Sequence, residues 1–136
     1  MARTLEITIP GRPVPKPRQT VSDKWRNPPR ACVARYRAWA DLARLKAREA
    51  GKMPPADRIT RITCRAYFQP PKSWSAKRRS AAMGTFHRSM PDASNVIKAA
   101  EDSIFDQDKA LADIRIQKFW GEPERVELMI EYEPCL

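Results

Sequence analysis

The residues best suited to chemistry lie in the stretch 90–119, where several carboxylates recur around one lysine. From Pro91 to about Phe105 this stretch predicts a helix. On a wheel of about 100° per residue, Lys98 and Asp102 fall within about 60° of Asn95, and apolar side chains occupy the opposite side. One helix face is therefore predicted to be polar and the other to belong to the core.

Further carboxylates flank this predicted helix. Asp92 precedes its first turn, and Asp106 and Asp108 follow its end, in a loop that leads to the next strand. Carboxylates gathered at one point repel each other unless a cation lies among them, and Mg²⁺, with Mn²⁺ as a substitute, suits an all-oxygen set. Such a metal polarises a phosphodiester and orients a water, while a nearby lysine neutralises charge on the phosphate. This chemistry is that of a magnesium-dependent nuclease.

Each of these residues also has an ordinary structural interpretation. Asp92 could be only the N-cap of the helix, after Pro91. Lys98 and Asp102 could form only an i,i+4 ion pair. The aspartates past the helix end could be solvated loop residues, so spacing alone leaves both interpretations open.

Charge is unevenly distributed along the chain of 136 residues, whose net charge is +10. Residues 1–100 carry 22 basic and 6 acidic side chains, and residues 101–136 carry 4 and 10. A strongly cationic body favours a polyanionic partner, most commonly nucleic acid, although a basic protein without such a partner remains possible.

Basic residues gather in two segments that are candidates for phosphate contacts. The first is the proline-rich loop 10–30, which predicts a semi-rigid strap with Trp25 available to stack, or else an ordinary connection. The second is the short basic helix predicted over 75–83, before a mobile-looking segment 84–90. The candidate DNA contacts are Lys16, Arg18, Lys24, Arg26, Lys77, Arg78, Arg79, His87, Arg88 and Lys118. His87 is expected near the site if its segment folds over it, or else at the surface.

The remaining elements predict a single α+β domain, 1–136, with a mixed sheet of about four strands packed by helices. Strands are expected over 4–9, 59–68, 110–120 and 126–132, the last two joined as a hairpin by the turn 121–124. A helix is expected over 31–50, burying Cys32, Tyr36, Trp39, Ala43, Ala47 and Ala50. The sequence contains no CxxC pair of the kind that binds zinc. Cys32 and Cys64 are therefore interpreted as small buried apolar residues.

The sequence resembles the RusA family of Holliday junction resolvases over nearly its whole length. The family pattern P-D-x-D-N-x-x-K-x-x-x-D-A-L is followed by a D-D pair and by a strand that ends in lysine. In matching order, this chain has Pro91-Asp92-Ala93-Ser94-Asn95, Lys98, Asp102, Asp108 and Lys118. The early PGRPVPKPR and the segment 70–92 also resemble the family. Two positions depart from it: Ser94 replaces the second aspartate, and Gln107 replaces the first residue of the D-D pair.

The resemblance implies a homodimeric endodeoxyribonuclease of DNA recombination and repair, which cuts four-way junctions by paired nicks. Carried over, Asp92 and Asp108 are magnesium ligands, Lys98 is the catalytic lysine and Asp102 is a supporting acid that can also bind the metal. Ser94 leaves a weakened nuclease, or a protein that binds branched DNA without cutting it, as alternatives. A nuclease that acts on other branched or single-stranded substrates, or on RNA, is a third and weaker alternative.

No apolar run approaches the ~20 residues of a membrane span, and the start of the chain lacks the apolar stretch of a signal peptide. We therefore expect no membrane partner and a location in the cytoplasm of a bacterial or phage-infected bacterial cell.

Overall fold

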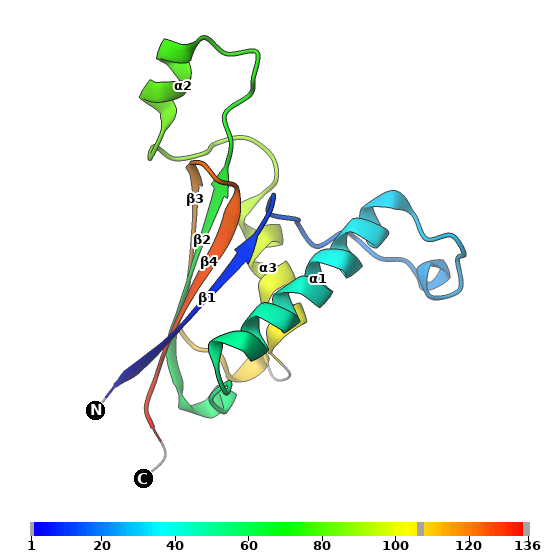
Figure 1. The fold of residues 1–136 in the computed structure, drawn as a ribbon. Coiled ribbons are helices and arrows are strands. Elements are labelled where there is room, and N and C mark those ends of the chain that lie inside the picture. The colour runs from blue at the N-terminus through cyan, green and yellow to red at the C-terminus, as the bar shows by residue number, and fades with distance from the viewer. Residues whose placement is uncertain (1, 106–107, 135–136) are drawn as a thin grey trace.

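Four strands and three α-helices make up the regular structure within residues 2–105 and 108–134, which are the residues that the computed structural model describes (Figure 1). In chain order they are β1 (Arg3–Pro10), α1 (Ala31–Ala50), β2 (Ile59–Phe68), α2 (Ala76–Ala82), α3 (Ala93–Ile104), β3 (Ile114–Trp120) and β4 (Arg125–Tyr132). Short 3-10 turns, η1 (Val21–Lys24), η2 (Ala56–Arg58) and η3 (Asp108–Ala110), lie in the connections. The predicted α+β class and single mixed sheet are confirmed.

The strands lie in the order β1-β4-β2-β3. β4 is antiparallel to both of its neighbours, and β2 and β3 are parallel. Two parallel neighbours require a crossover connection, and here that connection contains α2 and α3. The crossover carries α3 from the far end of β2 back to the start of β3, so the two ends of α3 lie near opposite ends of the sheet.

The predicted hairpin between the last two strands is wrong, because β2 lies between β3 and β4. The turn after Trp120 therefore passes over the end of β2, where the Gly121 N–H donates to the Phe68 carbonyl at 2.9 Å. A Cβ at Gly121 would lie 2.7 Å from Cδ1 of Tyr67, so this glycine allows the close passage. Alternation and turn residues indicate two strands and a bend, but they do not identify the strand that inserts between them.

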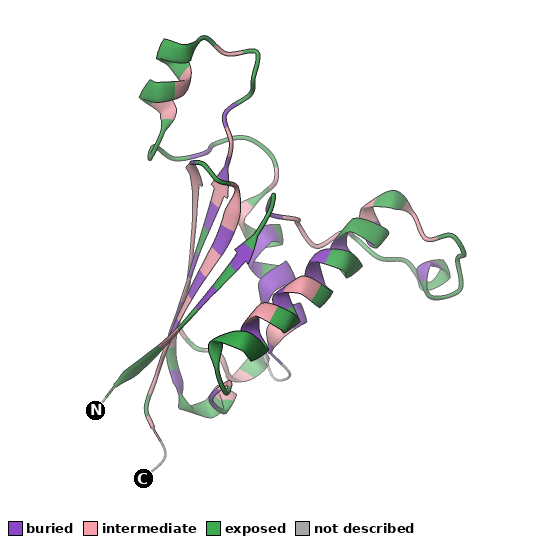
Figure 2. Cartoon of the chain, in the orientation of Figure 1, coloured by how far each residue is buried: buried purple, intermediate pink, exposed green. Residues whose placement is uncertain are grey.

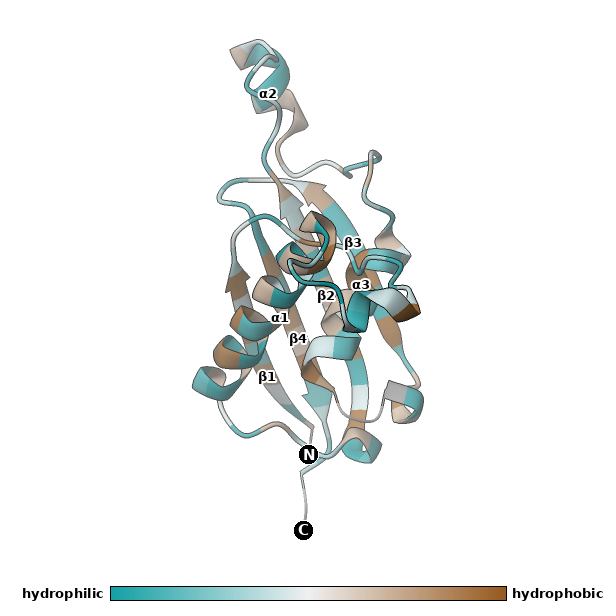
Figure 3. Ribbon diagram, turned by 90° about the vertical axis from the view of Figure 1, so that its right-hand side faces the viewer, coloured by the Kyte–Doolittle hydropathy of each residue, from teal (hydrophilic) through white to brown (hydrophobic). Residues whose placement is uncertain are grey.

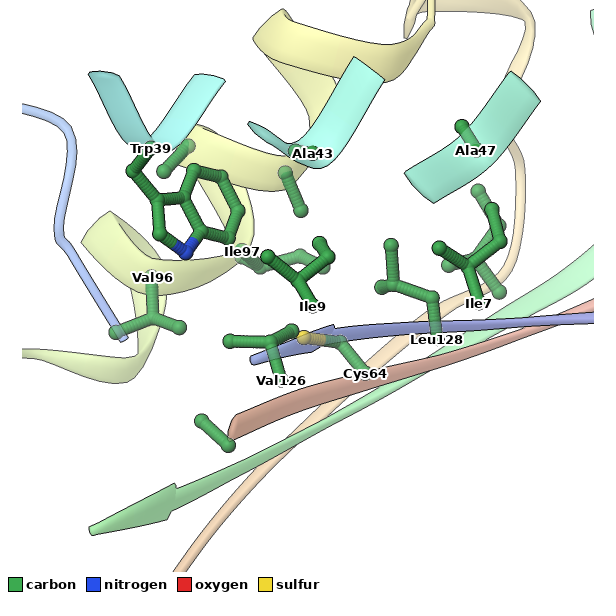
Figure 4. Close-up of a cluster of buried hydrophobic side chains, with 14 of the residues drawn as sticks. Ile7, Ile9, Trp39, Ala43, Ala47, Cys64, Val96, Ile97, Val126 and Leu128 are labelled. Carbon is green, nitrogen blue, oxygen red and sulfur yellow. The ribbon is translucent and has the colours of Figure 1, made fainter. Parts of the chain in front are cut away.

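The core lies between one face of the sheet and the helices α1 and α3 (Figure 4). Alternate residues of the strands point into it, as in Ile7 and Ile9 of β1 and Leu128 and Ile130 of β4, all at most 2% exposed. Burying such a side chain stabilises the fold by about 1.5–3 kcal/mol. The alternation of apolar and polar residues in the sequence therefore predicts correctly which side chains of these strands face the core.

The buried face of α1 differs in part from the predicted one. Tyr36, Trp39, Ala43 and Ala47 are buried as expected, whereas Ala50 is exposed and Cys32 is only half-buried. The helix buries Val33 and Ala40 in addition. Cys32 and Ala50 lie in the first and last turns of α1, where a helix has fewer neighbours to cover it. Cys64 is fully buried, and burial raises the pKa of its thiol to about 12, which fits an inert apolar role.

Two basic segments project from this body (Figure 1). One is the arm, defined here as residues 11–30, which extends beyond the first turn of α1. The other is the segment 70–84 with α2, which extends beyond the ends of β2 and β3. Figure 2 shows that both projections are largely exposed. Among the described residues, no helix combines the length and apolarity needed to cross a bilayer.

Candidate active site and nucleic-acid interface

Asp92 is the N-cap of α3, and its carboxylate is exposed. The Asp92 carbonyl starts the helix by accepting from the N–H groups of Asn95 and Val96, each at 3.1 Å. The side chain itself makes no capping hydrogen bond. The backbone alone therefore performs the capping role that the sequence left open for the carboxylate. The partial positive charge of the helix N-terminus favours an anionic group at this place.

Lys118 holds the chain immediately before Asp92. Its ammonium donates to the Ser89 carbonyl at 2.6 Å and to the Pro91 carbonyl at 2.5 Å. Burial lowers the pKa of Lys118, and the negative charge of Asp92 opposes that shift. Lys118 was predicted as a DNA contact; the structure instead uses it to fix the backbone that presents Asp92.

The segment 84–87 is hydrogen-bonded to the far half of β3. Gly84 N–H donates to the Trp120 carbonyl and Trp120 N–H to the Thr85 carbonyl, both at 2.9 Å, while His87 N–H donates to the Lys118 carbonyl at 3.0 Å. This short edge pairing differs from the mobile segment expected from the sequence. It extends the sheet and places the start of α3 at a defined position.

His87 is buried, with 5% of its surface exposed. Its ring stacks on Phe68 at a centroid distance of 4.2 Å and meets Trp120 edge-on at 4.3 Å. Burial lowers its pKa, and the charges of Lys118 and Arg12 lower it further. The interpretation of His87 as a surface residue is wrong. With its ring inside an aromatic cluster, His87 anchors the segment 84–87 and does not face a phosphate.

The polar face of α3 continues from Asp92 along its first turns. Ser94, Asn95 and Lys98 are all exposed, while Val96 and Ile97 are buried on the opposite side. Lys98 lies about 9 Å further along the helix axis than Asp92. The lysine side chain is long and flexible enough for its ammonium to contact a phosphate group that lies between the two residues. The predicted division of α3 into a polar face and a core face is confirmed.

Asp102 lies at the other end of α3 and forms an ion pair with Lys16 of the arm. The Lys16 ammonium also lies 5.6 Å from the centre of the Tyr36 ring of α1. Ten residues of helix separate Asp92 from Asp102, a rise of about 15 Å. Asp102 therefore joins the arm to α3, and the ion pair that was predicted with Lys98 is made with Lys16.

The rise of about 15 Å keeps the carboxylates of Asp92 and Asp102 from sharing one ion within a single chain, whereas the role of Asp108 at the metal stays a prediction. The backbone of Asp108 begins η3, beyond the C-terminal end of α3, and the 12 residues of that helix rise about 18 Å. Asp106 and the side chain of Asp108 lie outside the described residues. Helical periodicity predicts which residues share a face of a helix. Residues on the same face can still lie far apart along the helix axis, because each residue adds about 1.5 Å of rise.

A comparison with protein families matches residues 10–131 to the model described as Endodeoxyribonuclease RusA. The chain belongs to the RusA endodeoxyribonuclease family. Members of this family act on branched DNA junctions, as the sequence resemblance implied. No curated protein matches the sequence significantly. The matched residues include the arm, all of α3, and β2, β3 and β4 except Tyr132, whereas only Pro10 of β1 is matched.

The RusA assignment raises the question of whether this site suits a magnesium ion. The described side chains contain no group of three or more His, Cys, Asp or Glu that could hold a metal. Mg²⁺ in phosphate chemistry commonly uses only one or two protein carboxylates and takes its other ligands from water and substrate phosphate. Asp92, with the neutral oxygens of Ser94 and Asn95 nearby in sequence, fits a site of this kind.

The arm of this RusA chain presents several of the predicted DNA contacts. Arg18, Lys24 and Arg26 are exposed on it, whereas the ammonium of Lys16 is bound to Asp102. The arm base is joined to the active-site helix, because the Lys16 N–H donates to the Asn95 carbonyl at 3.0 Å. The arm therefore approaches α3 within one helical turn of Asp92.

The segment 70–84, which contains α2, carries the second group of predicted DNA contacts. Lys77 is exposed, the guanidinium of Arg78 lies 3.8 Å from the centre of the Trp74 ring, and Arg79 pairs with Glu122 at 3.0 Å. Arg88, in the segment before α3, is exposed. Figure 1 places the start of α3 between α2 and the arm, and Figure 3 shows α2 at one end of the molecule with the arm turned toward the viewer. The acidic site thus lies between two basic projections.

The sequence interpretation missed the residues that brace the arm. Asp23 is buried and accepts hydrogen bonds from the Arg30 guanidinium at 2.9 and 2.7 Å and from the Thr20 N–H at 2.7 Å. The hydrogen bonds from Arg30 and Thr20 hold the pKa of Asp23 well below its usual value. The pattern T-x-x-D, which is typical of a capping box, was the signal that could have identified this brace.

Proposed function

We propose that this RusA-family chain is a magnesium-dependent, structure-specific endonuclease that resolves Holliday junctions or other branched DNA by paired nicks. One observation carries the proposal: Asp92 is exposed at the start of α3, next to backbone carbonyls that Lys118 holds, and Figure 1 draws the start of α3 between two basic projections. The projections attract the phosphate backbone, and the exposed carboxylate of Asp92 attracts a cation.

The roles of the chain's own residues follow from this arrangement. Asp92 binds the metal together with a DNA phosphate, and Lys98 stabilises negative charge that develops on that phosphate. When bound, Mg²⁺ polarises the phosphodiester and lowers the pKa of water. Lys118 keeps the Asp92 backbone in place and does not touch the substrate. Asp102 and Asp108 are not needed at the same ion in this arrangement.

We propose that the active form is a homodimer. A four-way junction has approximate twofold symmetry, so two symmetric cuts require two sites related by a twofold axis. The single site per chain at the start of α3 meets that requirement when two chains assemble. A monomeric mass in solution together with full junction cleavage would contradict this part of the proposal.

A second candidate function is binding of branched DNA without cleavage. The observation that favours it is the single carboxylate among the first residues of the site, where Ser94 supplies a hydroxyl in place of the family's second aspartate. A hydroxyl is a neutral and weaker magnesium ligand than a carboxylate. The same fold would then hold a junction through its basic projections alone.

Cleavage of a labelled synthetic four-way junction distinguishes the two functions. We expect nicks at symmetric positions with Mg²⁺ or Mn²⁺, no nicks with EDTA, and little cleavage of a linear duplex of the same sequence. Binding without nicking at any divalent metal would overturn the nuclease and favour the binder. Ser94→Asp should raise the nicking rate if the missing carboxylate limits metal binding.

Charge reversal on α2 tests the proposed DNA contacts separately. Replacing Lys77, Arg78 and Arg79 by glutamate should weaken junction binding and reduce its dependence on salt, because phosphate contacts release counterions. Lys109→Glu provides the control, because it reverses the charge of an exposed cation in η3, away from the start of α3. Unchanged affinity and salt dependence in the α2 variant would remove this segment from the interface.

A further inference from the structure

The tip of the arm exposes two large apolar side chains. Trp25 is 81% exposed and Val21 is 78% exposed, more than any other large hydrophobic residue among those described. Both belong to or adjoin η1, and the Trp25 N–H donates to the Ser22 carbonyl at 3.1 Å. Exposed apolar surface at a projecting tip is unfavourable in water unless a partner covers it.

The arm that carries Trp25 is held in a defined conformation. The buried Asp23 binds Thr20 and Arg30 across the turn, and Arg30 also donates to the Arg18 carbonyl at 2.9 Å. The Arg37 guanidinium of α1 donates to the Asp23 carbonyl at 3.3 Å. The arm therefore presents its tip without first having to become ordered, which reduces the entropic cost of binding.

The charges around the tip favour an anionic partner. Lys24 and Arg26 flank Trp25 in sequence and are exposed, as is Arg18 on the other side of η1. Asp23 is the only acidic residue of the arm, and it is buried against Arg30. Two such arms from neighbouring copies would repel each other, so the tip is unsuited to self-association and suited to DNA.

We propose that Trp25 stacks on an unpaired or unstacked base at the branch point of DNA, while Lys24 and Arg26 bind the adjacent phosphates. This inference rests on the proposed function, because it names the feature of branched DNA that the arm recognises. A continuous duplex keeps its bases stacked on each other, so their faces are not available to Trp25. At a branch point the stacking is interrupted, and an aromatic ring can cover an open base face.

Binding measurements on matched DNA substrates test the proposal. The affinities of wild type, Trp25→Ala and Trp25→Phe are compared for a four-way junction and for a linear duplex of equal length, with EDTA present to prevent cleavage. Stacking on one base is worth about 1–3 kcal/mol, which corresponds to a loss of roughly 5- to 150-fold. We expect Trp25→Ala to lose about 10-fold in junction affinity and less than about twofold in duplex affinity, and Trp25→Phe to retain most of the preference.

A fluorescent base reports the contact directly. 2-Aminopurine at the branch point should change its emission when wild type or Trp25→Phe binds, and much less when Trp25→Ala binds. The same base placed in a duplex arm should respond equally to all three. Leu45→Ala, which removes an exposed apolar side chain of α1 distant from the arm tip, is the matched control and should bind like wild type.

The outcomes separate this inference from the proposed function. If wild type prefers the junction and Trp25→Ala keeps the same preference, the stacking role is overturned and the junction nuclease stands. Equal losses on junction and duplex would make Trp25 a general DNA contact and also overturn it. A change in oligomeric mass on Trp25→Ala would assign the tip to a contact between copies instead. A wild type without junction preference would overturn both.

Discussion

The two ends of α3 carry aspartates in different environments. At the N-terminal end, Asp92 is exposed at the helix cap, and Lys118 is bound to the carbonyls before it. Toward the C-terminal end, Asp102 is half-buried and paired with Lys16 of the arm. The two residues lie within about 80° of each other on a helical wheel, yet the axial rise gives them different neighbours.

This difference separates a carboxylate available to a cation from one that already holds a cation. The carboxylate of Asp102 is paired with the ammonium of Lys16, and this ion pair joins the arm to α3. Asp92 is exposed at the start of α3, which lies between the two basic projections in Figure 1. We therefore propose that the N-terminal end of α3 takes part in the reaction and that Asp102 has a structural role.

The largest expected effect is that of removing the charge of Asp92. Asp92→Asn keeps the size of the side chain and the backbone cap, so the fold should be preserved. Metal assistance is worth several kcal/mol in the transition state, and junction nicking should fall about 100-fold or more. Nicking rates measured at saturating enzyme check this, with the thermal midpoint as a control for folding. Full activity in Asp92→Asn would remove Asp92 from the reaction.

A smaller effect is expected from releasing the backbone before Asp92. Lys118→Met removes both hydrogen bonds to the carbonyls of Ser89 and Pro91, and we expect a loss of about 1–2 kcal/mol in the free energy of unfolding. Nicking should fall by about 10-fold, since a displaced carboxylate is poorly oriented. Urea unfolding and single-turnover nicking give the two values.

The exposed Lys72→Met is the control for Lys118→Met, because it removes an ammonium from an exposed position of the segment 70–84. It should leave both the stability and the cleavage of bound DNA close to wild type. A Lys118→Met variant with lower DNA affinity but unchanged stability and unchanged single-turnover rate would show a phosphate contact, as the sequence first predicted.

The ion pair at the other end of α3 should affect stability more than cleavage. A double-mutant cycle with Lys16→Met and Asp102→Asn should give a coupling of about 1 kcal/mol, because both side chains are partly buried. Asp102→Asn should nick within about threefold of wild type, since the proposed metal site lies at the other end of α3. A loss comparable to that of Asp92→Asn would return Asp102 to the active site.

The smallest effect concerns the histidine that anchors the segment before α3. Burial holds the pKa of His87 below its usual value, so the unfolded chain takes up a proton near pH 6.5 while the folded chain resists it. The free energy of unfolding should therefore decrease as the pH falls from 7 to 5, by at most about 1.4 kcal/mol per pH unit for one proton.

His87→Phe tests this dependence, because phenylalanine can occupy the place between Phe68 and Trp120 without titrating. The free energy of unfolding of wild type should fall relative to that of the variant as the pH drops below about 6.5, and the two profiles should run parallel above pH 7, in a region where Lys118 and Arg12 keep their charges. Profiles that stay parallel over the whole pH range would show that His87 titrates as an exposed group.

Most of the fold could be predicted from local patterns. The alternation in β1, β2 and β4 identifies buried strands, and a stretch of 20 residues without proline or glycine identifies α1. Strand order could not be predicted, because pairing is decided by contacts between distant residues. The turn at Gly121 resembles that of a hairpin, although the tyrosine ring over which it passes belongs to a third strand.

The candidate site could be predicted only in part. The sequence identified Asp92, the exposed face of α3 and the basic segments, because these depend on position along one helix or loop. It could not reveal that Lys118 binds carbonyls, that His87 is buried or that Lys16 binds Asp102. Each of these depends on which element folds against the residue, and charge alone suggested DNA contacts for all three.

Manganese binding detected by electron paramagnetic resonance tests the central claim most directly, that the Asp92 end of α3 holds the metal. Wild type, Asp92→Asn and Asp102→Asn are each titrated with Mn²⁺ in complex with a junction whose phosphates resist cleavage. The account predicts bound Mn²⁺ in wild type and in Asp102→Asn, and a large loss in Asp92→Asn. Retention of the metal in Asp92→Asn, together with its loss in Asp102→Asn, would show that the metal is held at the other end of α3.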